Sequence, residues 1–132
     1  MSRSDKRPPR PTDSELEILN VLWDRGPATV RQVHESLSRI KLSQYTTTLK
    51  LMQIMTEKGL LERDESERSH IYTPRVRREQ VQQQVAAHVM NRVFGGSARN
   101  LLMGALGAKR ASKKELAELR RLLDEYEKGK ER

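Results

Sequence analysis

The stretch from residue 42 to residue 59, L-S-Q-Y-T-T-T-L-K-L-M-Q-I-M-T-E-K-G, constrains the fold more than any other part of the chain. Residues suited to a buried stripe recur in it at i, i+3, i+4 and i+7, and they are Thr48, Leu51, Met52 and Met55. Ser43 is a residue type that caps helix N-termini, and Gly59 is a type that ends helices. The pattern predicts one amphipathic helix with Ser43 as its N-cap.

The other face of this predicted helix is mostly polar, and its residues are Gln44, Thr46, Thr47, Lys50 and Ile54. Threonine is β-branched and is disfavoured inside helices, although the cost is smaller near an N-terminus. Its hydroxyl and methyl groups suit contacts with phosphates, base edges and the thymine methyl group. On this stretch alone two interpretations stay open, a DNA-reading helix or a core helix with a polar outer face.

Two helices are predicted before this stretch. Thr12 with Glu15 and Thr29 with Gln32 form capping boxes at their starts. The apolar positions of the first are Leu16, Leu19, Val21, Leu22 and Trp23, and those of the second are Val30, Val33 and Leu37. R-G-P at 25–27 ends the first helix, and residues 40–42 form the turn before the third.

Two short strands are predicted after Gly59, at residues 60–63 and 70–73, around a polar hairpin tip at 64–69. Pro74 ends the second strand. The order helix, helix, helix, strand, loop, strand over residues 12–74 predicts a winged helix-turn-helix with a two- or three-stranded wing. This combination is more specific than any one helix.

From residue 75 the pattern is helical again, and we expect a mainly α protein. A fourth helix is predicted up to Gly95-Gly96, a short fifth one is capped by Ser97, and a last one begins with the Ser112 and Glu115 capping box. Their apolar stripes include Val81, Val85, Val89, Met90, Val93, Phe94, Leu101, Leu102, Ala105, Leu106, Leu116, Leu119, Leu122, Leu123 and Tyr126.

These stripes need a surface to cover them, and a second copy of the chain is the natural one because most soluble oligomers are twofold dimers. The residues expected to hold the homodimer are Val85, Val89, Val93, Phe94, Leu101, Leu102, Leu116, Leu119 and Leu123. The alternative is that these helices pack on their own winged domain. The predicted organisation is a disordered basic tail at 1–11, a winged-helix DNA-binding domain at 12–74 and a helical dimerisation domain at 75–132.

The net charge of +8 and the pI near 10.1 favour a polyanionic partner. The charge is uneven, since residues 1–74 hold 12 Lys and Arg against 11 Asp and Glu, whereas residues 75–132 hold 14 against 7. The total is therefore no direct evidence that residues 42–59 bind DNA. Four cations in the tail at 1–11 suit a DNA backbone or minor groove, or are simply a solvated leader.

Other chemistry finds little support in the sequence. The chain has no cysteine, and His34, His70 and His88 lie far apart without a metal-binding motif. No nucleophile, general base or metal cluster is identified, so we expect no enzyme activity, no cofactor and no metal. No apolar run is long enough to span a membrane, and the N-terminus lacks a hydrophobic segment. We expect a cytoplasmic protein without membrane insertion.

The chain resembles the penicillinase-repressor family, the BlaI, MecI and CopY group of bacterial winged-helix repressors. The segments that carry the resemblance are E-L-E-I-L-N-V-L-W, A-T-V-R-Q-V-H-E-S-L, Y-T-T-T-L-K-L-M with E-K-G-L-L, R-S-H-I-Y-T-P, Gly95-Gly96 and E-L-A-E-L-R-R-L-L. They run from about Thr12 to about Leu123. The Y-T-T motif followed by E-K-G-L-L and the wing is fairly specific, whereas the C-terminal helices alone would be weak.

The resemblance implies a homodimer that binds a palindromic double-stranded DNA operator and represses resistance or stress genes. The residues that it places at the DNA are Tyr45, Thr46, Thr47, Lys50, Arg68, Ser69 and His70. We add Ser43 and Gln44, which stand at the start of the third helix, to the expected DNA-binding residues. Where many relatives have Thr the chain has Lys50, and where they often have Arg it has Ile54, so no operator sequence carries over.

The chain departs from the family pattern in the residues needed for two known mechanisms of release. The copper-responsive branch uses C-terminal cysteine pairs, which this chain lacks. The β-lactam branch is cut by a membrane metalloprotease at an Asn-Phe bond, and the aligned bond here is Gly104-Ala105, with Asn100-Leu101 the nearest similar pair. A regulatory protease as partner is therefore left open. The alternative function is a winged-helix module that binds proteins without specific DNA binding.

Overall fold

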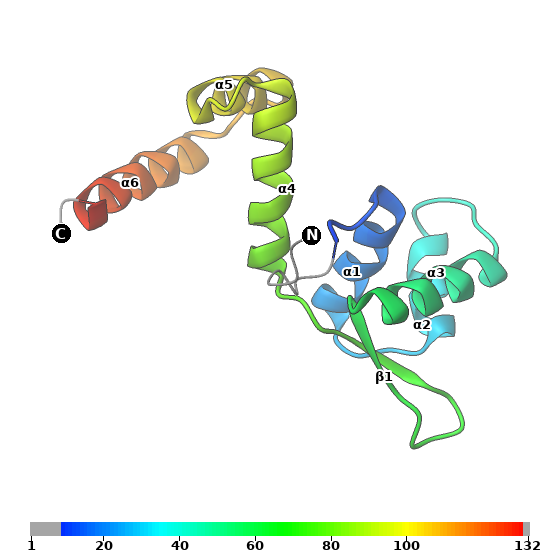
Figure 1. Cartoon of the computed structure of the whole chain (residues 1–132). Helices are drawn as coiled ribbons and strands as arrows, with labels where there is room; N and C mark the ends of the chain where they lie inside the picture. The colour runs from blue at the N-terminus through cyan, green and yellow to red at the C-terminus, as the bar shows by residue number, and fades with distance from the viewer. Residues whose placement is uncertain (1–8, 131–132) are drawn as a thin grey trace. The chain divides into compact units, whose positions relative to one another are not determined.

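The computed structural model describes residues 9–130, and most of the predicted tail at 1–11 lies outside them (Figure 1). The chain divides into two compact units, one up to Ala86 and one from Ala87. This division falls inside helix α4 (Arg78–Val93), whereas the sequence placed a boundary after Pro74. Residues 78–86 of α4 group with the winged domain, and Val81 among them is buried.

The first unit begins with the helices α1 (Asp13–Arg25), α2 (Val30–Ser38) and α3 (Tyr45–Lys58), as predicted. Both capping boxes are confirmed. The Thr12 hydroxyl accepts from the Glu15 N–H at 3.2 Å, and the Thr12 N–H donates to the Glu15 carboxylate at 3.0 Å. Thr29 and Gln32 repeat this arrangement at 3.1 and 2.9 Å. Each box satisfies backbone donors that the first turn of a helix leaves free.

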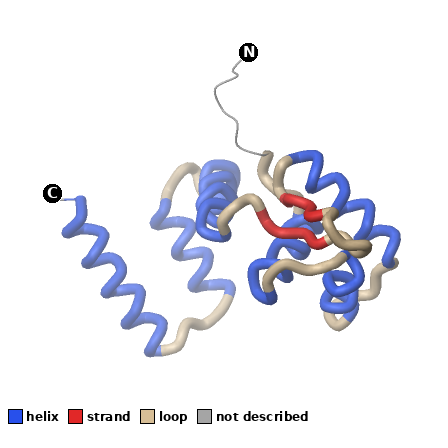
Figure 2. The backbone as a smooth tube through the Cα atoms, turned by 90° about the horizontal axis from the view of Figure 1, so that it is seen from below, coloured by secondary structure: helices blue, strands red, loops and turns tan. Residues whose placement is uncertain are grey.

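The wing is an antiparallel pair of strands, β1 (Leu61–Asp64) and β2 (Ile71–Pro74), drawn in red in Figure 2. Leu61 pairs with Pro74 and Asp64 with Ile71. A single bridge between Ala28 and Tyr72 attaches the segment before α2 to this sheet. The prediction of a two- or three-stranded wing is confirmed in its two-stranded form.

Both strands start one residue later than predicted, and the end of α3 explains the first shift. Gly59 has the left-handed φ of 87° that ends a helix, and the next N–H, that of Leu60, donates to the Met55 carbonyl at 2.9 Å. Leu60 therefore belongs to the helix cap and not to β1. Its side chain is buried in the core.

Ser43 is not the N-cap of α3, and this prediction was wrong. Gln44 takes the cap position with an extended backbone (φ −97°, ψ 146°), and no side chain accepts from the first turn. Because the helix begins at Tyr45, Ser43 lies one residue too early to accept from that turn. Among the described residues, its hydroxyl oxygen is buried without a hydrogen-bond partner.

The core of the first unit lies between the three helices and the wing. Its buried apolar residues are Ile18, Leu19, Leu22, Ala28, Val30, Val33, Leu37, Met52, Met55, Leu60, Leu61 and Tyr72. Thr48, Met52 and Met55 are buried as predicted, whereas Leu51 is half-buried at the edge. Trp23 also lies at the edge, where its indole N–H donates to the Val76 carbonyl at 3.1 Å and its ring contacts Arg78.

One buried ion pair joins the start of α1 to the end of α3. The Glu15 side chain is 2% exposed, and its carboxylate lies 2.8 Å from the ammonium group of Lys58. Burial by itself raises the pKa of Glu15, but hydrogen bonds from Lys58 and the Thr12 N–H outweigh it, so the pKa lies below its usual value. The pair therefore stabilises the fold when Glu15 is ionised.

We expect Lys58→Met to lower the free energy of unfolding by about 1–3 kcal/mol at neutral pH, because a buried carboxylate loses its partner. Because the pKa of Glu15 is lower in the folded than in the unfolded chain, its ionised form stabilises the fold at pH values above the unfolded pKa of about 4.3. This stability is lost as the pH falls through the folded pKa. Urea unfolding at pH about 7 and about 3.5 measures this effect. The difference in the free energy of unfolding between Lys58→Met and wild type should be smaller at the acid pH. Lys41→Met is the matched control, since its pair with Glu17 is exposed (47% and 44%).

The second unit contains the end of α4 and the helices α5 (Ala98–Ala108) and α6 (Lys113–Lys130). Gly95 and Gly96 form the turn after α4 with φ of 60° and 79°, and the Ser97 hydroxyl caps α5 as predicted. Gly104 lies close to Phe94, since a Cβ built on it would be 3.0 Å from two ring carbons. No helix between residues 9 and 130 combines the length and apolar character needed to cross a membrane.

Candidate DNA interface

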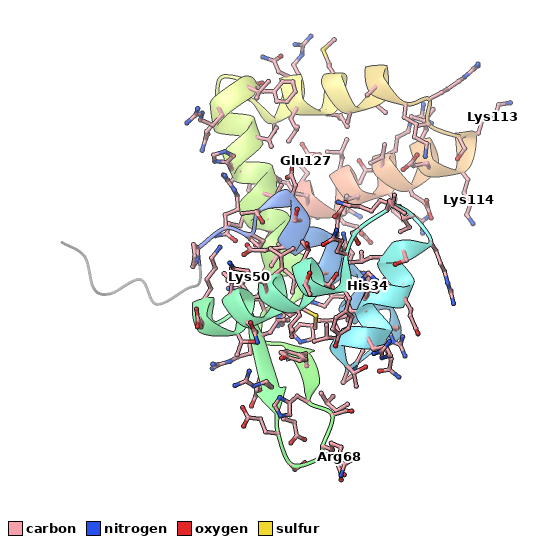
Figure 3. The ribbon with its side chains drawn as sticks, turned by 90° about the vertical axis from the view of Figure 1, so that its right-hand side faces the viewer. His34, Lys50, Arg68, Lys113, Lys114 and Glu127 are labelled. Carbon is pink, nitrogen blue, oxygen red and sulfur yellow. The ribbon has the colours of Figure 1, made fainter. Side chains whose placement is uncertain are left out.

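The outer face of α3 presents three of the nine residues predicted to contact DNA. Thr46, Thr47 and Lys50 are exposed, and they line a shallow groove of about 320 Å³ with Leu51 and Ile54. Figure 3 shows Lys50 on this helix. An exposed helix face with hydroxyls, methyl groups and one cation has the chemistry to contact base edges and phosphates in a major groove.

Tyr45, the first residue of α3, is held by two side chains of α2. The guanidinium group of Arg31 lies 5.3 Å from the centre of its ring, and the His34 ring meets it edge-on at 5.7 Å. Figure 3 marks His34 on α2. His34 also shares a hydrogen bond of 3.4 Å with the hydroxyl of Thr48, which is buried. These contacts fix the start of α3 against α2.

The structure brings Tyr45 and the predicted wing residues around one cleft. This cleft has a volume of about 380 Å³ and lies between the starts of α2 and α3 and the wing. Its polar lining includes Thr29, Arg31, Tyr45, Arg68, Ser69 and His70. Arg68 lies toward the end of the hairpin in Figure 3. The lining contains two guanidinium groups and no carboxylate, so it suits an anionic group.

The tip of the wing has the opposite charge. Arg63 pairs with Glu65 at 2.6 Å, and the Ser66 N–H donates to the Asp64 carboxylate at 2.9 Å. That backbone hydrogen bond lowers the pKa of Asp64. Glu67 adds a further carboxylate next to Arg68. A polyanion is therefore favoured on the Arg68 to His70 side of the wing and disfavoured at the acidic turn.

The predicted set is thus divided between two neighbouring surfaces. Thr46, Thr47 and Lys50 line the groove on α3, whereas Tyr45, Arg68, Ser69 and His70 line the cleft beside the wing. Gln44 is exposed at the start of α3, and Ser43 is half-buried before it. Neither of these two lines the groove or the cleft.

The sequence analysis did not predict that Arg31 and His34 contact Tyr45. The signal for Arg31 was its place in the first turn of α2, two residues after the Thr29 cap. Its meeting with Tyr45 depends on how α2 and α3 cross, which the pattern within either helix does not give. His34 contacts α3 and His70 lies on the wing, and no group of three His, Cys, Asp or Glu that could hold a metal occurs within residues 9–130.

Comparison with known proteins identifies one family. The chain is 24% identical over 125 residues to the penicillinase repressor of Bacillus licheniformis, covering 95% of the chain and 98% of that protein. It is 40% identical over 63 residues to the transcriptional regulator BlaI of Mycobacterium tuberculosis, covering 47% of the chain and 46% of that protein.

The solved structures include a similar domain. The DNA-binding domain of the repressor BlaI, determined in solution, superimposes with a TM-score of 0.50 at 26% identity. The match covers 56% of this chain and 90% of that domain. The sequence profile described as "Penicillinase repressor" matches residues 11–125, nearly the whole chain. The chain belongs to the penicillinase repressor family.

Proposed function

We propose that the chain is a DNA-binding transcriptional repressor that acts as a homodimer on a palindromic operator. The observation that carries the proposal is the exposed Thr46, Thr47 and Lys50 face of α3 beside the Arg31 and Arg68 cleft. The first surface suits base edges and the second suits a backbone phosphate. The relatives named above are repressors, and the similar solved domain is described as DNA-binding.

The homodimer is supported by the second unit. Between Ala87 and Lys130 no residue of the single chain is buried. Large apolar side chains there are strongly exposed, among them Val93 at 69%, Leu123 at 57% and Tyr126 at 68%. Large apolar side chains left exposed in this number favour an interaction site in a soluble protein. A second copy would cover it and place two α3 helices on two half-sites about one DNA turn apart.

Release of the repressor by a regulatory protease stays open. Gly104 and Ala105, which flank the bond aligned with the family's cleavage site, lie inside α5, and Gly104 is close to the Phe94 ring. A protease would have to open this part of α5 to reach the bond. The Asn100-Leu101 bond lies in the same helix, one turn earlier.

The function is tested by isolating bound fragments of genomic DNA, sequencing them and measuring affinity for the shared site at several salt concentrations. We expect one palindromic site to bind at least about 10³-fold more tightly than random duplex, with an affinity that falls steeply with salt. A module that binds only proteins would show little affinity for any duplex at any salt concentration. That result would overturn the proposal.

Arg68→Ala sharpens the same experiment. If Arg68 contacts a phosphate, its loss should weaken operator and random DNA about equally and lower the salt slope by about one. Glu67→Ala is the neighbouring control, which removes a charge of the opposite sign and should not reduce affinity. A loss confined to the operator would show that Arg68 reads a base.

A further inference from the structure

The outer face of α3 carries two rows of side chains with different chemistry. Thr46 and Lys50, at i and i+4, form a polar row. Thr47, Leu51 and Ile54, at i, i+4 and i+7, form a second row that offers a methyl group and two aliphatic side chains. Both rows line the groove of about 320 Å³. The aliphatic row has only the Thr47 hydroxyl to offer in hydrogen bonding.

The two aliphatic side chains, Leu51 and Ile54, differ in their contact with the hydrophobic core. Leu51 is half-buried and packs against the hydrophobic core. Ile54 lies one turn further along α3 and is not part of that core cluster among the described residues. Ile54 is itself half-buried, but contact with the core cluster does not account for an isoleucine at this position. Its branched side chain lines the groove beside Lys50.

We propose that Ile54, with Leu51 and the Thr47 methyl group, reads the C5-methyl groups of thymines in the operator. The proposal rests on the proposed function, since it requires α3 to lie in a major groove. The thymine methyl is the apolar feature by which base pairs differ in that groove, and hydrocarbon side chains detect it by contact. From Thr47 to Ile54 the helix rises about 10 Å, enough to face about three base pairs.

The experiment replaces thymines of the selected operator by deoxyuridine, one position of each half-site at a time. This removes one methyl group per half-site and leaves every hydrogen-bonding group in place. At the position facing Ile54 we expect affinity to fall about fourfold for each methyl group lost, the amount that corresponds to burying one such group. Positions that do not face Thr47, Leu51 or Ile54 should be unchanged.

Ile54→Ala assigns the contact to its residue. The variant should bind the thymine operator more weakly and should no longer distinguish it from the deoxyuridine operator at that position. Its thermal unfolding should stay close to wild type, because Ile54 is only half-buried and is not part of the core cluster. Ile40→Ala is the matched control, since Ile40 is 79% exposed but lies after α2, outside this groove, and should keep the wild-type preference for thymine.

The outcomes separate this inference from the function on which it rests. If every deoxyuridine operator binds as tightly as the thymine operator, methyl reading is wrong, whereas preference for the operator over random duplex would still support the repressor. If Ile54→Ala keeps the full preference for thymine, another residue reads the methyl group and the assignment is wrong. Loss of all specific binding by the wild type would reject both.

Discussion

Val89→Asp is expected to abolish operator binding without touching α3 or the wing. Val89 is half-buried in the single chain, on the stripe of α4 that also contains Val85 and Val93. In the proposed dimer this stripe is covered by the partner, so the aspartate would bring an unpaired carboxylate into an apolar interface. Such a charge costs several kcal/mol. A dimer that depends on this surface should dissociate or partly unfold.

Sedimentation and operator binding check this result together. The wild type should sediment as a dimer at micromolar concentration, and Val89→Asp as a 15.3 kDa monomer with much weaker operator affinity. Gln83→Asp is the matched control, because it adds the same charge to α4 at an exposed position off the valine stripe. A monomeric wild type that binds the palindrome tightly would contradict the account.

The winged domain was predictable because its signals are local. Thr12 and Thr29 each cap a helix by accepting a hydrogen bond from the N–H of the residue three positions later. Gly59 ends a helix because its backbone adopts the left-handed conformation. Such contacts depend on neighbours in the sequence, so a single chain displays them. The alternation of apolar residues gave the strands of the wing to within one residue. Family membership followed from these segments in order.

The errors and omissions concern contacts between elements. Ser43 was chosen as a cap by residue type, but the backbone of Gln44 decides where α3 begins. Arg31 and His34 gain their role from the crossing of α2 and α3, which brings them to Tyr45. The periodicity of the second unit predicted its helices, whereas the surface that covers them stays a prediction.

Lys50→Ala should produce the second large effect, a loss of operator affinity of about 1–3 kcal/mol if Lys50 reads a base. This equals about a 5- to 150-fold change in the dissociation constant. Lys50 is exposed one turn after Thr46, on the polar row of the groove, where its ammonium group can reach guanine acceptors or a phosphate. Lysine and alanine both favour helix, so α3 should remain intact.

Base pair substitutions across the half-site distinguish the two contacts. If Lys50 reads a base, Lys50→Ala should lose the preference for the operator base pair at one position and keep it at the others. If Lys50 contacts a phosphate, the affinity for all DNA sequences should fall together and the salt slope should fall by about one. Lys113→Ala removes the same charge from the exposed start of α6 and is the matched control. If Lys50→Ala binds the operator as tightly as wild type and melts at the same temperature, Lys50 is not part of the interface. Thr46 and Thr47 would then be the polar contacts of α3.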